Sequence, residues 1–177
     1  MMYYIDSVQK IQSIEGALKI ILDTFNDIRG EIWTVYSEND FLPGFVEDKV
    51  TISYKNVLRG LHGDPLTGKL ITCLSGKFQL AMADMRKSSP TYANTYMVTL
   101  DDRKPISIYV PPGCINGHLC LSDRCVFHYK WTEFYTDAAN QATVSWDDSG
   151  LNLPWLTKNP ILSNRDQNGT SFKEKYL

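Results

Sequence analysis

The fold class of this chain follows from the stretch Lys69-Leu70-Ile71-Thr72-Cys73-Leu74-Ser75-Gly76-Lys77-Phe78-Gln79-Leu80-Ala81-Met82-Ala83. Two apolar runs flank the pair Ser75-Gly76, which is typical of a turn. Because each run is short and a glycine separates them, the stretch predicts two β-strands rather than a helix.

The same pattern recurs from Leu18 onward, where short segments rich in Val, Ile, Tyr, Phe and Thr alternate with Gly, Pro, Asp and Asn. Further strands are predicted at residues 19–22, 31–36, 49–54, 96–100, 107–110, 118–121 and 126–132. This spacing predicts an all-β protein, either a β-sandwich or a double-sheet barrel. Helix signals are weak and confined to short stretches around residues 9–17 and 136–141. No repeat or linker is visible, so residues 1–177 are expected to form one domain.

The composition excludes several classes of partner. The net charge of −2 gives no basic surface for nucleic acid or anionic lipid. No signal peptide and no apolar run of membrane-spanning length is visible, so we expect a cytoplasmic protein. The four cysteines form no Cys-x-x-Cys motif, and no paired histidines accompany them. They are therefore expected to be reduced, buried thiols rather than zinc ligands.

The segment Leu58-Arg59-Gly60-Leu61-His62 combines a candidate base with a candidate phosphate ligand. A guanidinium binds phosphate oxygens in a fork, and a glycine allows the backbone to approach a ligand closely. The ordinary interpretation is an exposed strand end with an ion-paired arginine. The functional interpretation is that His62 removes a proton from a substrate held by Arg59.

Three further residues complete a set able to move a proton beside a ketone. Asp166 would orient His62, although by itself it is an ordinary loop carboxylate. Lys69 would stabilise an enolate oxygen, although a lysine opening a strand is usually solvated. Tyr129 would return a proton to the opposite face of the carbanion. Alternation places Tyr129 with Phe127 on one face of its strand, which is also what an aromatic core stripe requires.

A metal-dependent mechanism is disfavoured by counting ligands. The chain has three histidines, and no two of them form a His-x-His pair. The dinucleotide, P-loop and nucleophile-elbow motifs are absent from the sequence as well. Since the ketone of a substrate acidifies the neighbouring C–H bonds by itself, we expect no metal and no cofactor.

From about Leu18 to Asp166 the order and spacing of these motifs resemble the dTDP-4-dehydrorhamnose 3,5-epimerase family. The matching segments are Asp27-Ile28-Arg29-Gly30, Leu58-Arg59-Gly60-Leu61-His62, Gly68-Lys69-Leu70, Asp84-Met85-Arg86-Lys87-Ser88-Ser89-Pro90-Thr91, Pro112-Gly113, Tyr129-Lys130-Trp131-Thr132-Glu133-Phe134-Tyr135, Trp146-Asp147-Asp148, 151–155 and 162–166. The resemblance implies a cupin double-stranded β-helix, or jelly roll, that forms a homodimer by exchanging strands. The weak helix signals add short flanking helices to this expectation.

The resemblance also implies the reaction and the site. The substrate would be a nucleotide-diphosphate 4-keto-sugar, inverted at C3, C5 or both. By motif match His62 is the base, Asp166 its partner, Lys69 the enolate stabiliser and Tyr129 the acid, while Arg59 faces the diphosphate. Tyr135 would lie near the pocket, and Arg29 would reach the nucleotide of the neighbouring subunit.

Several recognition positions depart from the family pattern. Asn116 stands where the family usually has a second histidine, and His118 takes a phenylalanine position two residues further on. Either the pocket uses His118 differently, or the outcome is restricted to one carbon. Glu47 and Lys49 replace the usual Gln and Asn, and with Thr51 they join the expected substrate-binding set. The changes favour a GDP-4-keto-heptose over a dTDP-4-keto-6-deoxyhexose, in capsule or lipopolysaccharide sugar biosynthesis.

Two other functions stay open from the sequence. One is a nucleotide-sugar 3,4-ketoisomerase, because cupins with that activity use a similar Arg-Gly-x-His segment. The other is a non-catalytic cupin that binds sugar nucleotides, which the missing second histidine favours. The segments downstream of Asp84 favour the epimerase over the ketoisomerase.

Overall fold

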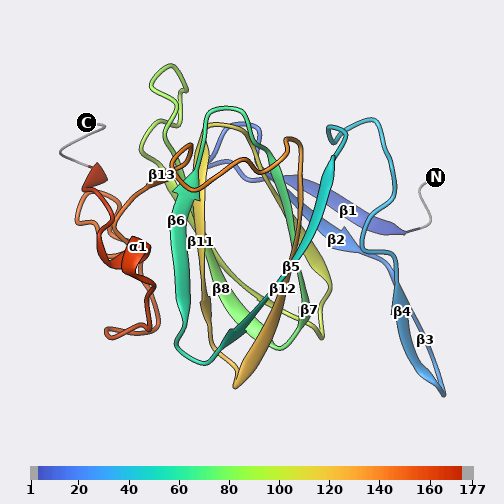
Figure 1. Ribbon diagram of the computed structural model, residues 1–177. Coiled ribbons are helices and arrows are strands. Elements are labelled where there is room, and N and C mark those ends of the chain that lie inside the picture. Colours follow the sequence, from blue (N-terminus) through green and yellow to red (C-terminus); the bar gives the residue numbers. More distant parts are fainter. Residues whose placement is uncertain (1–3, 173–177) are drawn as a thin grey trace.

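A computed structural model describes residues 4–172, which are almost entirely β (Figure 1). The elements are β1 (Ile5–Lys10), β2 (Leu18–Leu22), β3 (Thr24–Asp27), β4 (Gly30–Trp33), β5 (Glu47–Tyr54), β6 (Leu58–Gly63), β7 (Lys69–Ser75), β8 (Lys77–Asp84), β9 (Thr95–Asp101), β10 (Ile106–Val110), β11 (Cys114–Cys120), β12 (Arg124–Trp131), β13 (Ala142–Thr143) and the short helix α1 (Asn164–Gln167). Within residues 4–172 no helix is long and apolar enough to cross a membrane.

Two antiparallel sheets form the walls of a barrel. One has the strand order β1-β2-β10-β7-β12-β5, and the other has the order β13-β6-β11-β8-β9. The chain crosses repeatedly between the sheets, since β6 lies in one sheet and β5 and β7 lie in the other (Figure 1). The main core fills the space between them, with Ile71 and Phe127 from one wall and Phe78 and Leu80 from the other. The jelly-roll fold predicted from the sequence is confirmed.

Strand β5 shows how the sequence pattern sets the two faces of a wall. It is an edge strand, and its burial alternates along its length. Val50, Ile52 and Tyr54 are exposed on the outer face. Lys49, Thr51 and Ser53 consequently face the interior of the barrel, because successive side chains of a strand point to opposite faces.

The predicted strands are present, with differences at their ends. β11 begins at Cys114, four residues before the predicted start, and β3 and β6 were not predicted at all. β6 carries the segment from Leu58 to His62, in which the charged Arg59 and Gly60 interrupt the apolar alternation that indicates a strand. Gly60 itself lies against Gly117 of β11, where a Cβ would come within 2.5 Å of the Gly117 Cα. This glycine therefore serves strand packing, because a side chain at this position would collide with β11.

Both predicted helices are wrong. Residues 9 and 10 belong to β1, and the following residues form turns closed by bonds such as Ile14 N–H to the Ile11 carbonyl. Residues 136–141 form one turn, in which the Asn140 N–H bonds to Asp137. A short isolated helix is unfavourable because its first turn fixes many dihedrals for one hydrogen bond. Here Ile11 and Ile14 are buried in the core instead.

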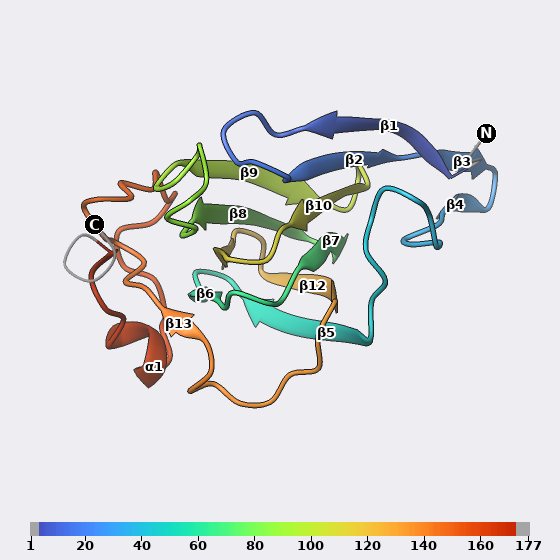
Figure 2. The ribbon, with the colours of Figure 1, turned by 90° about the horizontal axis from the view of Figure 1, so that it is seen from above.

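Two segments extend beyond the barrel walls. The β3–β4 hairpin projects at the end of the molecule opposite α1 (Figure 2) and exposes Phe25, Ile28 and Ile32. The segment after Trp155 folds back, so that Phe172 is buried with Leu61 and Val144. The four cysteines are free and buried, as predicted.

Candidate active site

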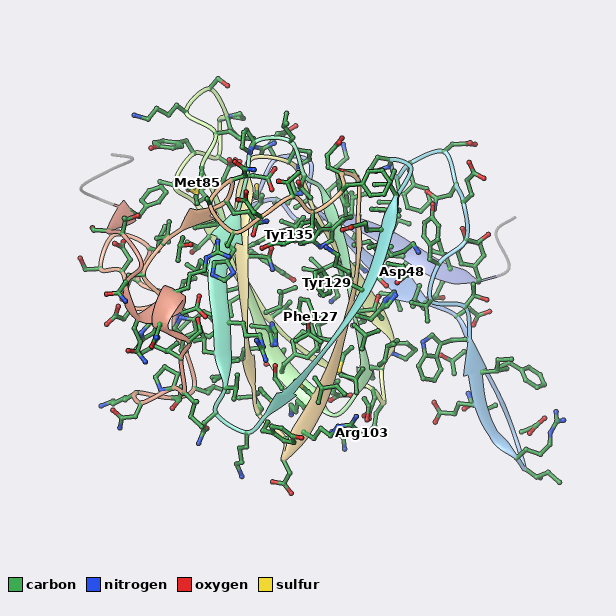
Figure 3. All side chains as sticks on the ribbon, viewed as in Figure 1. Asp48, Met85, Arg103, Phe127, Tyr129 and Tyr135 are labelled. Atoms are coloured by element: carbon green, nitrogen blue, oxygen red, sulfur yellow. The ribbon has the colours of Figure 1, made fainter. Side chains whose placement is uncertain are left out.

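A cavity of about 390 Å³ lies between the two sheets and is closed on one side by the C-terminal segment. Ten of the twelve predicted site residues line it; the exceptions are Arg29 and Glu47. Figure 3 shows Phe127, Tyr129 and Tyr135 in the space between β6 and β12. Consecutive ring contacts link Phe127, Tyr129, Trp131 and Tyr135 into an aromatic wall.

His62 and Asp166 meet across a separation of 104 residues. His62 Nε2 and Asp166 Oδ1 are 2.6 Å apart. Asp166 is fixed by α1, because its N–H donates to the N-cap Ser163 hydroxyl, which in turn donates to Asp166 Oδ2 at 2.8 Å. The bond to Asp166 occupies Nε2, so the second ring nitrogen of His62 is the one available for proton transfer.

Burial and the partner together set the charges of this pair. Burial lowers the pKa of His62 below its usual value, although the Asp166 carboxylate partly opposes that effect. Burial alone would raise the pKa of Asp166, but the hydrogen bonds from His62 and Ser163 outweigh it and hold that pKa below its ordinary value. The pair is therefore a neutral imidazole beside a carboxylate at neutral pH, which is the state of a general base.

Lys69, the first residue of β7, places a buried ammonium in the cavity. Its side chain is 4% exposed, and Nζ donates to Asn116 Oδ1 at 2.8 Å and to the His62 carbonyl at 3.3 Å. Burial lowers the pKa of Lys69 to about 8. No carboxylate among residues 4–172 forms an ion pair with it. A buried cation without an ion-pair partner is costly, and an anionic oxygen of a bound substrate would supply that partner.

Tyr129 faces His62 from the opposite wall. It belongs to β12 in the six-stranded sheet, whereas His62 belongs to β6 in the five-stranded sheet. The predicted alternation is confirmed, because Phe127, Tyr129 and Trp131 line the cavity. His128, on the outer face of the same strand, bonds instead to Asp48 at 2.6 Å. A substrate between the two walls would have an imidazole on one face and a phenol on the other.

Asn116 and His118 project from β11 into the same cavity. Asn116 pairs in register with His62 and accepts a hydrogen bond from Lys69, so its amide N–H groups remain to face a ligand. His118 pairs in register with Arg59. The hydroxyl of Ser53 connects these two residues, since Arg59 Nε donates to it at 3.1 Å and His118 Nε2 lies 3.1 Å from it.

Lys49 supplies a second cation at the mouth of the cavity. Its Nζ lies 4.0 Å from the centroid of the Trp131 ring and 4.6 Å from that of Tyr135. Glu47 forms an ion pair with Lys49 and accepts the Tyr135 N–H at 3.1 Å. Glu47 therefore does not line the cavity but holds residues that do. Thr51 Oγ1 lies 3.5 Å from Tyr129 Oη.

Arg29 lies outside the cavity of its own chain. Its side chain is 83% exposed on the β3–β4 hairpin and pairs with Asp27 at 2.6 Å.

Sequence reasoning missed Ser53, Gln141, Ser163 and Arg165. Arg165 lines the cavity, and its Nη2 is enclosed without a partner among residues 4–172. Its position beside Asp166 in the sequence was the signal that could have identified it.

The cavity combines positive charge with acid–base groups. Lys49, Arg59, Lys69 and Arg165 line it, against the single carboxylate of Asp166. In a chain of net charge −2 this concentration of cations suits a diphosphate. Within residues 4–172 no three His, Cys, Asp or Glu side chains gather as metal ligands.

The sequence and structure match known proteins over nearly their whole length. The family model for dTDP-4-dehydrorhamnose 3,5-epimerase matches residues 11–174. The dTDP-4-dehydrorhamnose 3,5-epimerase of Methanothermobacter thermautotrophicus is 31% identical over 172 residues, with 92% of each chain covered.

Two solved structures show the same likeness. The dTDP-4-dehydrorhamnose 3,5-epimerase of Elizabethkingia anophelis superposes with a TM-score of 0.86 at 30% identity, covering 98% of this chain and 100% of that one. The Legionella pneumophila dTDP-6-deoxy-D-glucose-3,5-epimerase in complex with dTDP-4-keto-L-rhamnose has a TM-score of 0.88 at 26% identity, covering 94% and 93%. These matches show that the chain belongs to the dTDP-4-dehydrorhamnose 3,5-epimerase family of isomerases.

Proposed function

We propose that residues 1–177 form one catalytic domain that inverts C3, C5 or both of a nucleotide-activated 4-keto-sugar, without a cofactor. The observation that carries the proposal is the opposition of the His62–Asp166 pair and Tyr129 across one cavity, which the Lys69 ammonium also lines. An epimerase needs a proton acceptor on one face of a carbon and a proton donor on the other, and this arrangement supplies both.

The proposed reaction has two proton transfers. The free ring nitrogen of His62 takes the proton from the carbon beside the C4 ketone, and the C–H electron pair moves into an enolate. Lys69 stabilises the negative charge that develops on the C4 oxygen, because its buried ammonium lines the cavity and is poorly solvated. Tyr129 then protonates the opposite face of the carbon, and the imidazolium and phenolate return to their starting states through solvent.

Arg59 and Arg165 are the proposed diphosphate ligands, because both guanidinium groups line the cavity that holds the base. Arg29 is proposed to reach the nucleotide of a neighbouring subunit in a homodimer. Its exposure on the projecting hairpin, away from the cavity of its own chain, supports that role.

A GDP-linked 4-keto-heptose is the proposed preferred substrate. The proteins of similar sequence are named for dTDP sugars, and the Legionella structure contains one. Support for a different nucleotide comes from Glu47 and Lys49, which replace amides with an ion pair at the cavity mouth. Thr51, Asn116 and Tyr135 belong to the same proposed recognition set.

Proton NMR in deuterated water tests the proposal. The protein is added in turn to GDP-linked and dTDP-linked 4-keto sugars, and loss of the C3 or C5 signal reports proton abstraction. His62→Asn is expected to abolish the exchange. His128→Asn is the matched control, because His128 also pairs with an aspartate at 2.6 Å but lies outside the cavity. Undiminished exchange in the His62 variant would exclude His62 as the base.

The same samples separate the two alternatives. A 3,4-ketoisomerase would move the carbonyl, which carbon NMR of the product detects. A non-catalytic binding protein would bind the nucleotide sugar without any exchange. Faster exchange with dTDP than with GDP would contradict the proposed nucleotide preference but not the epimerase activity.

A further inference from the structure

His118 is a buried polar side chain that the proposed proton transfers do not use. It is 4% exposed, and its ring stacks on Phe127 with centroids 4.2 Å apart and an interplanar angle of 16°. The Phe78 ring lies 5.5 Å away on another side. A phenylalanine at this position would pack on these rings without burying a polar group. Burial of the His118 imidazole is unfavourable unless its nitrogens have polar partners.

The neighbouring hydrogen bonds assign the tautomer of His118. A guanidinium only donates, so the Ser53 hydroxyl oxygen accepts from Arg59 Nε. The Ser53 hydroxyl hydrogen has no acceptor within residues 4–172 except His118 Nε2, at 3.1 Å. His118 Nε2 is therefore the acceptor, and the ring proton resides on Nδ1.

Burial keeps this tautomer neutral. Burial and the neighbouring Arg59 charge lower the pKa of His118 to about 3. Neutral His118 consequently presents one N–H donor rather than two. His118 Nδ1 has no hydrogen-bond partner within residues 4–172. It is not among the polar atoms that are fully enclosed without a partner, and His118 lines the cavity, so Nδ1 is open to the cavity. An N–H left without a partner on the wall of a binding cavity is a place for a ligand oxygen.

Strand register indicates which oxygen that is. On β6 and β11, Asn116 is paired with His62 and His118 with Arg59. His118 therefore lies along the strands from the base toward the guanidinium. In a sugar that loses its C3 proton to His62 and carries its diphosphate on C1 beside Arg59, the carbon between these two positions is C2.

We propose that His118 donates a hydrogen bond from Nδ1 to the 2-hydroxyl of the sugar, and thereby selects substrates that carry this hydroxyl over 2-deoxy sugars. The inference rests on the proposed epimerase function and specifies its substrate class. Ser53 is a positioning residue, because it acts on the substrate only by fixing the tautomer of His118.

Nitrogen-15 NMR of histidine-labelled protein tests the tautomer without any substrate. The chain has only three histidines, so spectra of His118→Phe and His128→Asn assign the signals. At pH 7 the expected pattern for His118 is a neutral ring protonated on Nδ1. Ser53→Ala is expected to let the Nε2-protonated form appear. A protonated ring, or an Nε2-protonated ring in the unaltered protein, would overturn the proposal.

Kinetics with matched substrates test the recognition. The probes are a GDP-linked 4-keto-heptose, the GDP- and dTDP-linked 4-keto-6-deoxyhexoses and the 2-deoxy counterpart of each. Deuterium exchange at C3 is measured for every probe. The unaltered protein is expected to favour the 2-hydroxy sugar in kcat/KM by about 10- to 100-fold, because a 2-deoxy sugar would leave the buried Nδ1 donor unpaired. His118→Phe retains the aromatic stack, and this preference should fall to within about threefold.

The outcomes separate the two levels of proposal. An equal loss of kcat/KM on both sugars in His118→Phe, or no preference in the unaltered protein, would overturn the role of His118 while leaving the epimerase intact. No exchange with any sugar would refute the epimerase function, and the substrate role of His118 with it. His128→Asn serves again as the control and should keep both rate and preference.

Discussion

Replacing Lys69 with methionine should make the protein more stable and nearly inactive. Burial lowers the pKa of Lys69 from 10.5 to about 8. One pKa unit corresponds to about 1.36 kcal/mol, so holding this ammonium in the folded state costs about 3 kcal/mol at pH 7. Methionine has a similar shape and no charge, but it leaves Asn116 Oδ1 without its donor at a cost of about 1 kcal/mol.

The free energy of unfolding of Lys69→Met is expected to exceed that of the unaltered protein by about 2 kcal/mol at pH 7, or about 4–8 °C in Tm for a chain of this size. The sign with pH follows from the lowered pKa. Below pH 8 the lysine is charged in the folded and unfolded states, and the full penalty is present. Between about 8 and 10.5 the folded state releases its proton first, so the penalty fades and the advantage of Lys69→Met should shrink.

Urea unfolding at pH 7 and pH 9.5 measures the effect, with Lys55→Met as the control on an exposed turn. Deuterium exchange at the sugar should fall by about 10²- to 10³-fold in Lys69→Met alone, because the enolate loses its stabilising charge. Destabilisation by Lys69→Met at pH 7, or an advantage independent of pH, would refute the reasoning that the buried ammonium is retained for function.

Three further predictions concern the same chemistry. Asp166→Asn should lower kcat/KM by about 10²- to 10⁴-fold, because the amide no longer stabilises the imidazolium of His62. The control Asp147→Asn, on an exposed loop, should leave kcat/KM unchanged, and equal effects in the two variants would contradict the pairing of Asp166 with His62. The pH profile of kcat/KM should be a bell: activity falls on the acid side only below pH 6.5, where His62 with its lowered pKa gains a proton, and falls on the alkaline side near pH 8, where Lys69 loses one. The four buried cysteines should react with a disulfide reagent only after unfolding, since burial raises the pKa of thiols such as Cys73 to about 12; rapid reaction of the native protein would show that they are accessible.

Local pattern was enough to predict most of the architecture. The alternation of apolar and polar residues indicated the strands and placed Phe127, Tyr129 and Trp131 on one face, because side chains of a strand alternate with a period of two. The pattern failed at β6, where Arg59 and Gly60 interrupt it, and at the helical signal of residues 9–17, where packing of Ile11 and Ile14 overrode local propensity.

The sequence by itself therefore determined an all-β protein of short strands and supplied the residue types proposed for proton transfer, since both depend on local periodicity and on chemistry carried by single side chains; the jelly roll was what the family resemblance implied. Only the tertiary structure decided which groups are partners. The approach of Asp166 to His62, the bond from Lys69 to Asn116 and the chain from Arg59 through Ser53 to His118 depend on strand register and on where the C-terminal segment docks. Those contacts join residues far apart in the chain, and no local pattern encodes the geometry that brings them together.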